Sequence, residues 1–232
     1  MIPIHDNVPT RTFPVLTVAL IAVNVAVWLF YQLPSLEESV FELGFFPCEV
    51  EDSCPEHGEA WPVNAVTSMF MHGGWLHIIG NMLFLWIFGN NVEDAMGRAR
   101  FLVFYFLSGF AATALQASVT LAVGSAAEAE IPNVGASGAI AGVLGAYFLL
   151  FPFARVITLV PLFVVLIPVE VPALIFGGVW FLFQLWQGGF SLVAPNTGGG
   201  VAFFAHIGGF VFGVVAVRLF ATRRRPRVAG PW

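Results

Sequence analysis

Charged residues are scarce in this chain of 232 residues: they make up 10% of it, whereas hydrophobic residues make up 58%. Ordinary soluble domains contain about 25% charged residues. The composition therefore excludes a typical soluble enzyme and indicates that a lipid bilayer is the solvent. Lysine is absent, and nine arginines against fourteen acidic residues give a formal net charge of −5. Because a nucleic-acid-binding protein needs a basic face, we expect no nucleic-acid partner.

Cysteine is also rare, since only Cys48 and Cys54 are present. Two cysteines exclude a disulfide framework and a four-cysteine zinc site. Both lie in an acidic loop predicted to face an oxidising compartment, which favours a disulfide bond between them. Free thiols are the next alternative, followed by a metal site that includes His57. We otherwise expect no metal ion and no cofactor.

Long apolar runs dominate what remains. A membrane helix needs about 20 mainly apolar residues. The pattern predicts an all-α membrane protein with a bundle of six transmembrane helices in residues 14–220, between a cytoplasmic segment 1–13 and an Arg-rich cytoplasmic tail 221–232. The predicted spans are residues 14–31, 75–91, 101–123, 135–153, 171–187 and 201–217. Val156 to Val169 is too short for a span and contains Pro161 and Pro168, so we expect an interfacial or re-entrant connector.

The arginines predict the orientation of the bundle, because cationic residues near helix ends stay on the cytoplasmic side. With both termini in the cytoplasm, every arginine lies inside or at an inner helix end. The outer loop, residues 32–74, instead carries eight of the acidic residues. The first apolar run is longer than the apolar region of a typical signal peptide, so we expect it to be retained as a span. The sequence thus predicts a multi-pass protein of the cell (inner) membrane, with the lipid bilayer as its surroundings.

A few polar residues interrupt the spans, and each costs several kcal/mol in hydrocarbon unless it has a partner. His77 and Asn81 are four residues apart, on one face of the second span. Ser137 opens the fourth span and His206 lies in the sixth. Each of them alone could serve helix packing. Together they supply a nucleophile, a base and oxyanion donors, which are the parts of acyl-transfer chemistry.

Small residues surround both Ser137 and His206. One face of the sixth span is formed by Ala202, His206, Gly209 and Gly213. One face of the fourth span is formed by Ser137, Ala141 and Gly145, with Gly138 and Gly142 alongside. Such faces let helix backbones approach closely, which would bring His206 to Ser137. No acidic residue lies in the fourth span or between Val171 and Val217. A Ser/His dyad is therefore the simplest interpretation.

At these residues the chain resembles the rhomboid family of intramembrane serine proteases. The resemblance covers nearly the whole chain and rests on the motifs His77-x-x-x-Asn81, Gly135-Ala136-Ser137-Gly138 and Ala205-His206-x-x-Gly209-x-x-x-Gly213. It implies that Ser137 is the nucleophile and His206 the general base, with His77, Asn81 and the Ser137 backbone amide as the oxyanion hole. It also implies supporting roles for His72, Gly135, Gly138, Gly209, Gly213 and Glu93. The implied substrates are transmembrane segments of other membrane proteins.

Two positions depart from the family pattern. Val63-Asn64 stands where a Trp-Arg pair is frequent in the first outer loop, and Ala141 stands where an aromatic residue often packs on the catalytic imidazole. A catalytically inactive relative that binds or routes membrane proteins is one alternative function, but Ser137 and His206 are both present. A channel or transporter is another, but the predicted bundle interior holds no acidic or basic residue to bind an ion.

Overall fold

The computed structural model describes residues 2–54, 60–162, 165–193 and 202–222, so His57 and the tail from residue 223 lie outside the described residues. The helices are α1 (Val15–Val27), α2 (Leu36–Leu43), α3 (Trp61–Thr67), α4 (Trp75–Phe84), α5 (Asn90–Met96), α6 (Arg98–Val123), α7 (Ala126–Ala129), α8 (Ser137–Leu150), α9 (Ala173–Val193) and α10 (Phe203–Phe220). The strands are β1 (Ile2–Asp6), β2 (Arg155–Leu162) and β3 (Val165–Pro172). Short π-helical segments, η1 (Trp28–Gln32) and η4 (Leu85–Gly89), follow α1 and α4, and the 3₁₀ turns are η2 (Pro47–Glu51) and η3 (Ser68–Phe70).

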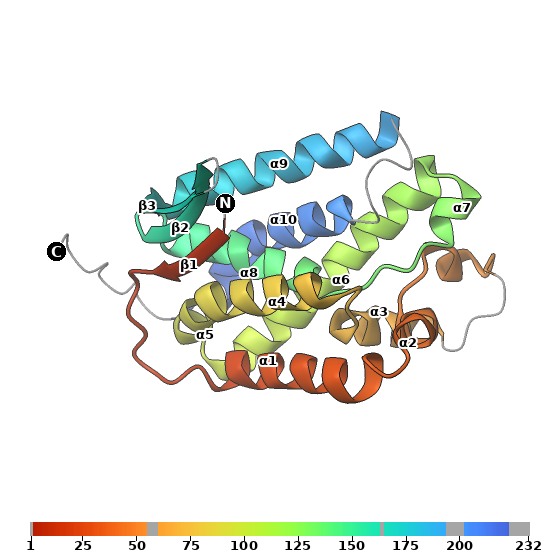
Figure 1. The fold of residues 1–232 in the computed structure, drawn as a ribbon, viewed down its shortest axis with the longest axis horizontal. Helices are drawn as coiled ribbons and strands as arrows, with labels where there is room; N and C mark the ends of the chain where they lie inside the picture. The colour runs from red at the N-terminus through yellow and green to blue at the C-terminus, as the bar shows by residue number, and fades with distance from the viewer. Residues whose placement is uncertain (1, 55–59, 163–164, 194–201, 223–232) are drawn as a thin grey trace.

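The helical membrane bundle predicted from the sequence is confirmed. Among the described residues, four helices are long and apolar enough to cross a membrane, at Val15–Gln32, Arg98–Val123, Ala173–Leu192 and Phe203–Phe220. Figure 1 shows α1 and α9 on opposite sides of the molecule, with α4, α6, α8 and α10 between them. Helix α8 has only 14 residues, and nearly all of its side chains are buried. Helix α8 therefore lies in the interior of the bundle and not on its lipid-facing surface.

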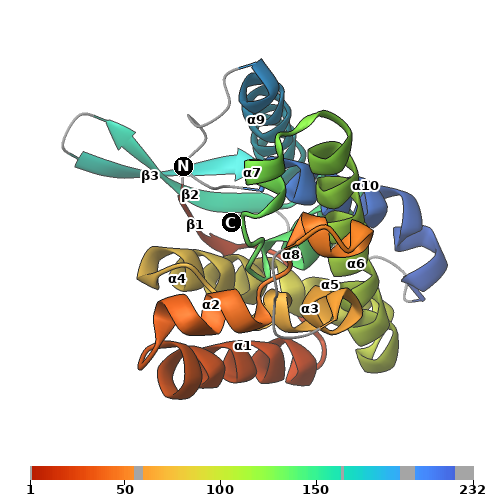
Figure 2. The ribbon, with the colours of Figure 1, turned by 90° about the vertical axis from the view of Figure 1, so that its right-hand side faces the viewer.

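A small antiparallel sheet, which the sequence pattern does not predict, lies at the end of the bundle where α8 ends. Strand β2 pairs with β1 on one side and with β3 on the other, and Asp6 lies opposite Val156. The stretch from Val156 to Val169, expected to be an interfacial or re-entrant connector, therefore forms most of a β-hairpin that extends beyond the helices (Figure 2). Its β-branched residues favour strands. Pro168 is tolerated because β3 is an edge strand.

Strand β1 is held to the bundle by the buried carboxylate of Asp6, which is 3% exposed. This carboxylate accepts hydrogen bonds from Asn91 Nδ2 in α5, at 2.8 Å, and from the hydroxyl of Tyr147 in α8. Burial raises the pKa of the Asp6 carboxyl from 3.8 to about 6, although the bond from Tyr147 favours the charged form. The N-terminal segment is thus tied to two helices that lie far from it in sequence.

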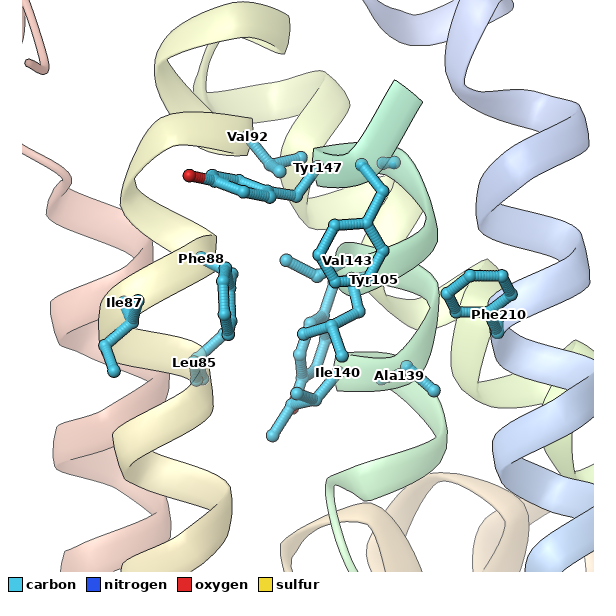
Figure 3. Close-up of a cluster of buried hydrophobic side chains, with 14 of the residues drawn as sticks. Leu85, Ile87, Phe88, Val92, Tyr105, Ala139, Ile140, Val143, Tyr147 and Phe210 are labelled. Carbon is cyan, nitrogen blue, oxygen red and sulfur yellow. The ribbon is translucent and has the colours of Figure 1, made fainter. Parts of the chain in front are cut away.

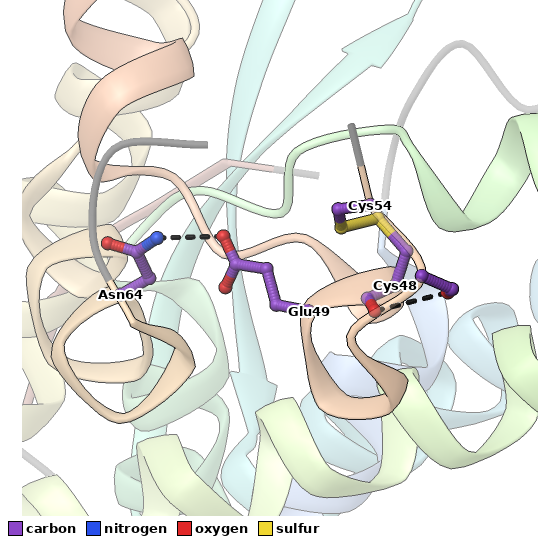
Figure 4. Close-up of a disulfide and its surroundings, with 5 residues drawn as sticks. Cys48, Glu49, Cys54 and Asn64 are labelled. Atoms are coloured by element: carbon purple, nitrogen blue, oxygen red, sulfur yellow. Dashed lines mark hydrogen bonds between the residues drawn. A yellow bond between two sulfur atoms is a disulfide. The ribbon is translucent and has the colours of Figure 1, made fainter. Parts of the chain in front are cut away.

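The loop between α1 and α4 is held by bonds of its own. A disulfide joins Cys48 and Cys54 (Figure 4). Asn64, one of the two residues at the position where the Trp-Arg pair is frequent, donates from Nδ2 to Glu49 Oε1 at 2.8 Å in a buried contact. Thr67 Oγ1 in α3 donates to the backbone carbonyl of Leu43 at 2.9 Å. These contacts fix the loop beside the start of α4, which carries two of the candidate site residues.

The core combines large aromatic side chains with very close backbone contacts. The rings of Phe88 and Tyr147 lie 4.9 Å apart at 69° in the cluster between η4 and α8 (Figure 3). Helices α8 and α10 approach through glycines: a Cβ added to Gly209 would lie 2.0 Å from the carbonyl oxygen of Gly138. A Cβ on Gly213 would lie 2.0 Å from the carbonyl oxygen of Gly142. The two small-residue faces meet, and this sets the positions of the helices that carry Ser137 and His206.

Candidate active site

Ser137 and His206 lie within hydrogen-bond distance of each other. Ser137 is the first residue of α8, His206 lies in the first turn of α10, and Ser137 Oγ is 2.9 Å from His206 Nε2. Both side chains are half-buried. Figure 1 shows that α8 begins at the end of the bundle nearest α3 and α7, opposite the sheet. Ser137 and His206 therefore lie toward the side of the acidic outer loop, residues 32–74.

The turn before Ser137 requires glycine. Gly135 has φ +122°, a backbone conformation that other residues rarely adopt, and an added Cβ would lie 2.7 Å from His77 Nε2 and 3.5 Å from Asn81 Nδ2. Its backbone N–H donates to the carbonyl of Ser68 at 2.8 Å, which fixes the turn. Gly135 thus lets the chain pass close to His77 and Asn81 immediately before the Ser137 helix begins.

His77 and Asn81 present N–H donors to this turn. The backbone N–H of Gly73 donates to His77 Nδ1 at 3.3 Å, so the proton of the neutral imidazole is on Nε2, the atom nearest Gly135. Asn81 is 8% exposed, and within the described part of the chain its Nδ2 has no hydrogen-bond partner. A buried donor without a partner is costly. These two groups can therefore receive a negatively charged oxygen that forms beside Ser137.

His72 lies behind His77, just before α4. It is completely buried, and its ring packs edge-on against that of His77 with 5.1 Å between centroids. Gln32 clamps its backbone, donating to the His72 carbonyl at 3.1 Å and accepting from its N–H at 2.8 Å. Burial lowers the pKa of the His72 imidazole to about 3, and neighbouring His77 acts in the same direction. His72 is therefore a neutral ring that supports His77.

Glu93 lies in α5, far along the chain from Ser137, and acts on α1 instead. Its carboxylate accepts from the backbone N–H groups of Leu16 and Thr17, at 3.0 and 2.8 Å, and from the Thr17 hydroxyl at 2.8 Å. The first turn of α1 has no side-chain cap of its own. A carboxylate at this position satisfies N–H groups that have no partner within the helix and favours the positive end of the helix dipole. The contacts of Glu93 are therefore structural.

Two residues beside His206 were missed by the sequence interpretation. Gln184 in α9 places Oε1 2.9 Å from His206 Nδ1, and the Trp180 ring lies 5.9 Å from the imidazole at 36°. They are one helical turn apart, on the same face of α9. An uncharged polar side chain within an apolar span is the signal that could have pointed to Gln184. Ala141 stands where an aromatic residue often packs on the imidazole in the family. In this chain the ring that packs on His206 is that of Trp180.

Residues 57–223, most of the chain, match the rhomboid domain family. Given the fold and this geometry, the chain belongs to the rhomboid family of integral membrane proteins. It is 28% identical to rhomboid protein 1, mitochondrial, of Saccharomyces cerevisiae over 94% of this chain and 58% of the relative. It is 30% identical to the putative rhomboid protease YdcA of Bacillus subtilis over 62% of this chain and 65% of that protein.

Rhomboid protease GluP of Bacillus subtilis is 32% identical over 57% of this chain and 24% of its own length. The chain therefore spans less than two thirds of the length of each of these curated relatives. Two of the three names contain the word protease. They support protease-type chemistry in this family.

Proposed function

We propose that this protein is an intramembrane serine endopeptidase that cleaves transmembrane segments of other membrane proteins. The observation that carries the proposal is the 2.9 Å separation between Ser137 Oγ and His206 Nε2. A serine hydroxyl is a weak nucleophile and needs a base at this distance. The names of the bacterial relatives agree with this function. An inactive relative would have no need of a serine and a histidine in this contact.

In the proposed reaction, His206 Nε2 takes the proton of Ser137 Oγ while Oγ attacks the carbonyl carbon of the scissile peptide bond. The carbonyl oxygen becomes negatively charged and accepts hydrogen bonds from His77 Nε2–H, Asn81 Nδ2–H and the Ser137 backbone N–H. The carbonyl then re-forms, the C–N bond of the peptide breaks, and the protonated His206 gives its proton to the leaving amine, which leaves an ester on Ser137 Oγ. Water, activated in turn by His206, hydrolyses the acyl–Ser137 ester and regenerates the hydroxyl.

The substrate must expose a carbonyl group within a segment that normally hides it in helical hydrogen bonds. We therefore expect cleavage in or beside transmembrane segments that unwind readily, at Gly, Pro or polar residues. Both termini of the protease are proposed to be cytoplasmic, from the arginine distribution. A reporter fused after residue 232 that is active only on the outer side would contradict this orientation.

The direct test is incubation of the detergent-purified protein with a generic single-span substrate. Ser137→Ala, His206→Ala and the double variant should be about equally inactive, because groups that act as a unit are not additive. Ser118→Ala is the matched control, since Ser118 is exposed on α6 and bonds to its own helix. A serine-reactive phosphonate should label the wild type at Ser137. Activity that survives in Ser137→Ala would end the serine-protease proposal.

The oxyanion donors are tested separately. Asn81→Ala and His77→Ala should each lower the catalytic rate by about 10²-fold, as single oxyanion donors do in other enzymes, without unfolding the protein. Thermal unfolding in detergent distinguishes lost catalysis from lost structure. A folded variant with full activity would show that the residue only supports packing.

A further inference from the structure

Gln184 contacts the edge of His206 that Ser137 does not use. Its Oε1 lies 2.9 Å from Nδ1, while Nε2 lies 2.9 Å from Ser137 Oγ. Gln184 is 6% exposed and comes from α9, whereas the two reacting residues come from α8 and α10. We propose that Gln184 is a positioning residue that fixes the tautomer and orientation of the His206 imidazole. This inference rests on the proposed function, in which His206 is the base.

The chemistry of a neutral imidazole explains why Nδ1 needs this partner. Such a ring carries one proton, on either Nδ1 or Nε2. A base that takes the Ser137 proton through Nε2 must carry its own proton on Nδ1. The Gln184 carbonyl oxygen is an acceptor only, so it stabilises that tautomer. Without it, the ring can carry its proton on Nε2, where it would donate to Ser137 Oγ and could not act as the base.

A glutamine suits this position better than a carboxylate. Helices α8, α9 and α10 contain no aspartate or glutamate, and an ionised carboxylate within the membrane is costly. An amide oxygen supplies the acceptor without burying a charge. An amide side chain takes the same place in the Cys-His-Asn sites of papain-like proteases. Gln184 would orient the base without placing a full negative charge beside the imidazolium.

Trp180 holds the same imidazole from a second direction. It lies one helical turn before Gln184, and its ring is 5.9 Å from that of His206 at a tilt of 36°. Ring packing limits rotation of the imidazole, while the Gln184 bond selects which ring nitrogen carries the proton. Because both contacts come from α9, this helix supplies what the Ala141 position of α8 does not.

The test compares three variants with the wild type. Gln184→Leu removes the acceptor with little change in size, and Gln184→Glu keeps an acceptor. Gln187→Leu makes the same chemical change at a half-buried position of the same helix. The measurements are kcat and KM on a single-span substrate, and the ¹⁵N shifts of the His206 ring, which distinguish Nδ1–H from Nε2–H whether or not the protein is active.

Gln184→Leu should lower kcat by about 10- to 100-fold, as for other groups that orient a functional histidine, with KM within about twofold of the wild type. Its His206 ring should lose the Nδ1–H tautomer. The kcat of Gln184→Glu should be at least about tenfold higher than that of Gln184→Leu. Gln187→Leu should match the wild type in all measurements.

Wild-type kcat and an unchanged Nδ1–H tautomer in Gln184→Leu would overturn the inference, even if Ser137→Ala is inactive. A glutamate variant whose His206 ring keeps the Nδ1–H tautomer but whose kcat is no better than that of the leucine variant would also overturn it. If Ser137→Ala instead keeps full activity, the proposed function fails, and the tautomer in Gln184→Leu alone decides whether Gln184 positions the ring.

Discussion

Gly213→Ala should disable the protein through packing alone. Gly213 lies on α10 two helical turns beyond His206, and the added methyl carbon would lie 2.0 Å from the carbonyl oxygen of Gly142 in α8. Non-bonded carbon and oxygen atoms do not approach closer than about 3 Å. Both sides of this contact are backbone, so no flexible side chain can move away. The helices must therefore separate by roughly 1 Å or more.

This separation would act directly on the candidate dyad. Ser137 begins α8 and His206 belongs to α10, and their hydrogen bond is 2.9 Å long. If the helices move as rigid bodies, the bond lengthens to about 4 Å, beyond the range of a hydrogen bond. A misplacement of about 1 Å can cost 10²-fold in rate, and overpacking typically costs about 1–3 kcal/mol of stability. We expect losses of that size in both.

Proteolysis of a single-span substrate and thermal unfolding in detergent are the assays. Gly178→Ala is the matched control, because a Cβ at that position of α9 would have no described residue within 4 Å. It should keep wild-type activity. If Gly213→Ala also keeps wild-type activity and stability, the close α8–α10 contact does not set the dyad geometry.

Three contacts away from the dyad should each contribute to the stability of the fold. Asp6 has a pKa of about 6 in the folded protein, raised from its ordinary value of 3.8. Between these two pH values the folded protein holds a proton that the unfolded chain has lost. The free energy of unfolding should therefore fall by up to about 3 kcal/mol as pH rises through this range. Asp6→Asn should remove that component of the denaturation profile, and an unchanged profile would contradict it. Replacing Cys48 and Cys54 by serine should cost about 2 kcal/mol in thermal unfolding while activity persists, since the closed loop is short; loss of activity without loss of stability would argue otherwise. Glu93→Ala should destabilise the protein by roughly 3 kcal/mol, because three donors of α1 lose their acceptor. Glu93→Gln should cost less, because its amide keeps one acceptor oxygen. Equal denaturation midpoints for the wild type and Glu93→Ala would refute the capping role.

The helical bundle and much of the candidate site can be predicted from the amino-acid pattern alone. Apolar runs of about 20 residues specify membrane helices because unpaired backbone groups are too costly in lipid. Helical periodicity placed His77 and Asn81 on one face. Small-residue stripes around Ser137 and His206 indicated two helices that approach closely, and the structure brings these two residues within 2.9 Å of each other. Each of these features is a pattern of residues within one helix, so it can be recognised from a short stretch of sequence.

Contacts between groups that are distant in the sequence depend instead on how the helices and strands pack. Strand β1 pairs with a strand about 150 residues later, and strand pairing across such a distance leaves no periodic signal in either segment. The partner of Glu93 is the start of α1, and the partner of His206 Nδ1 is Gln184. One uncharged polar residue in an apolar span has several possible neighbours. Its role is fixed by how the helices pack, because the geometry of three separate helices brings Gln184, His206 and Ser137 into one line of contacts.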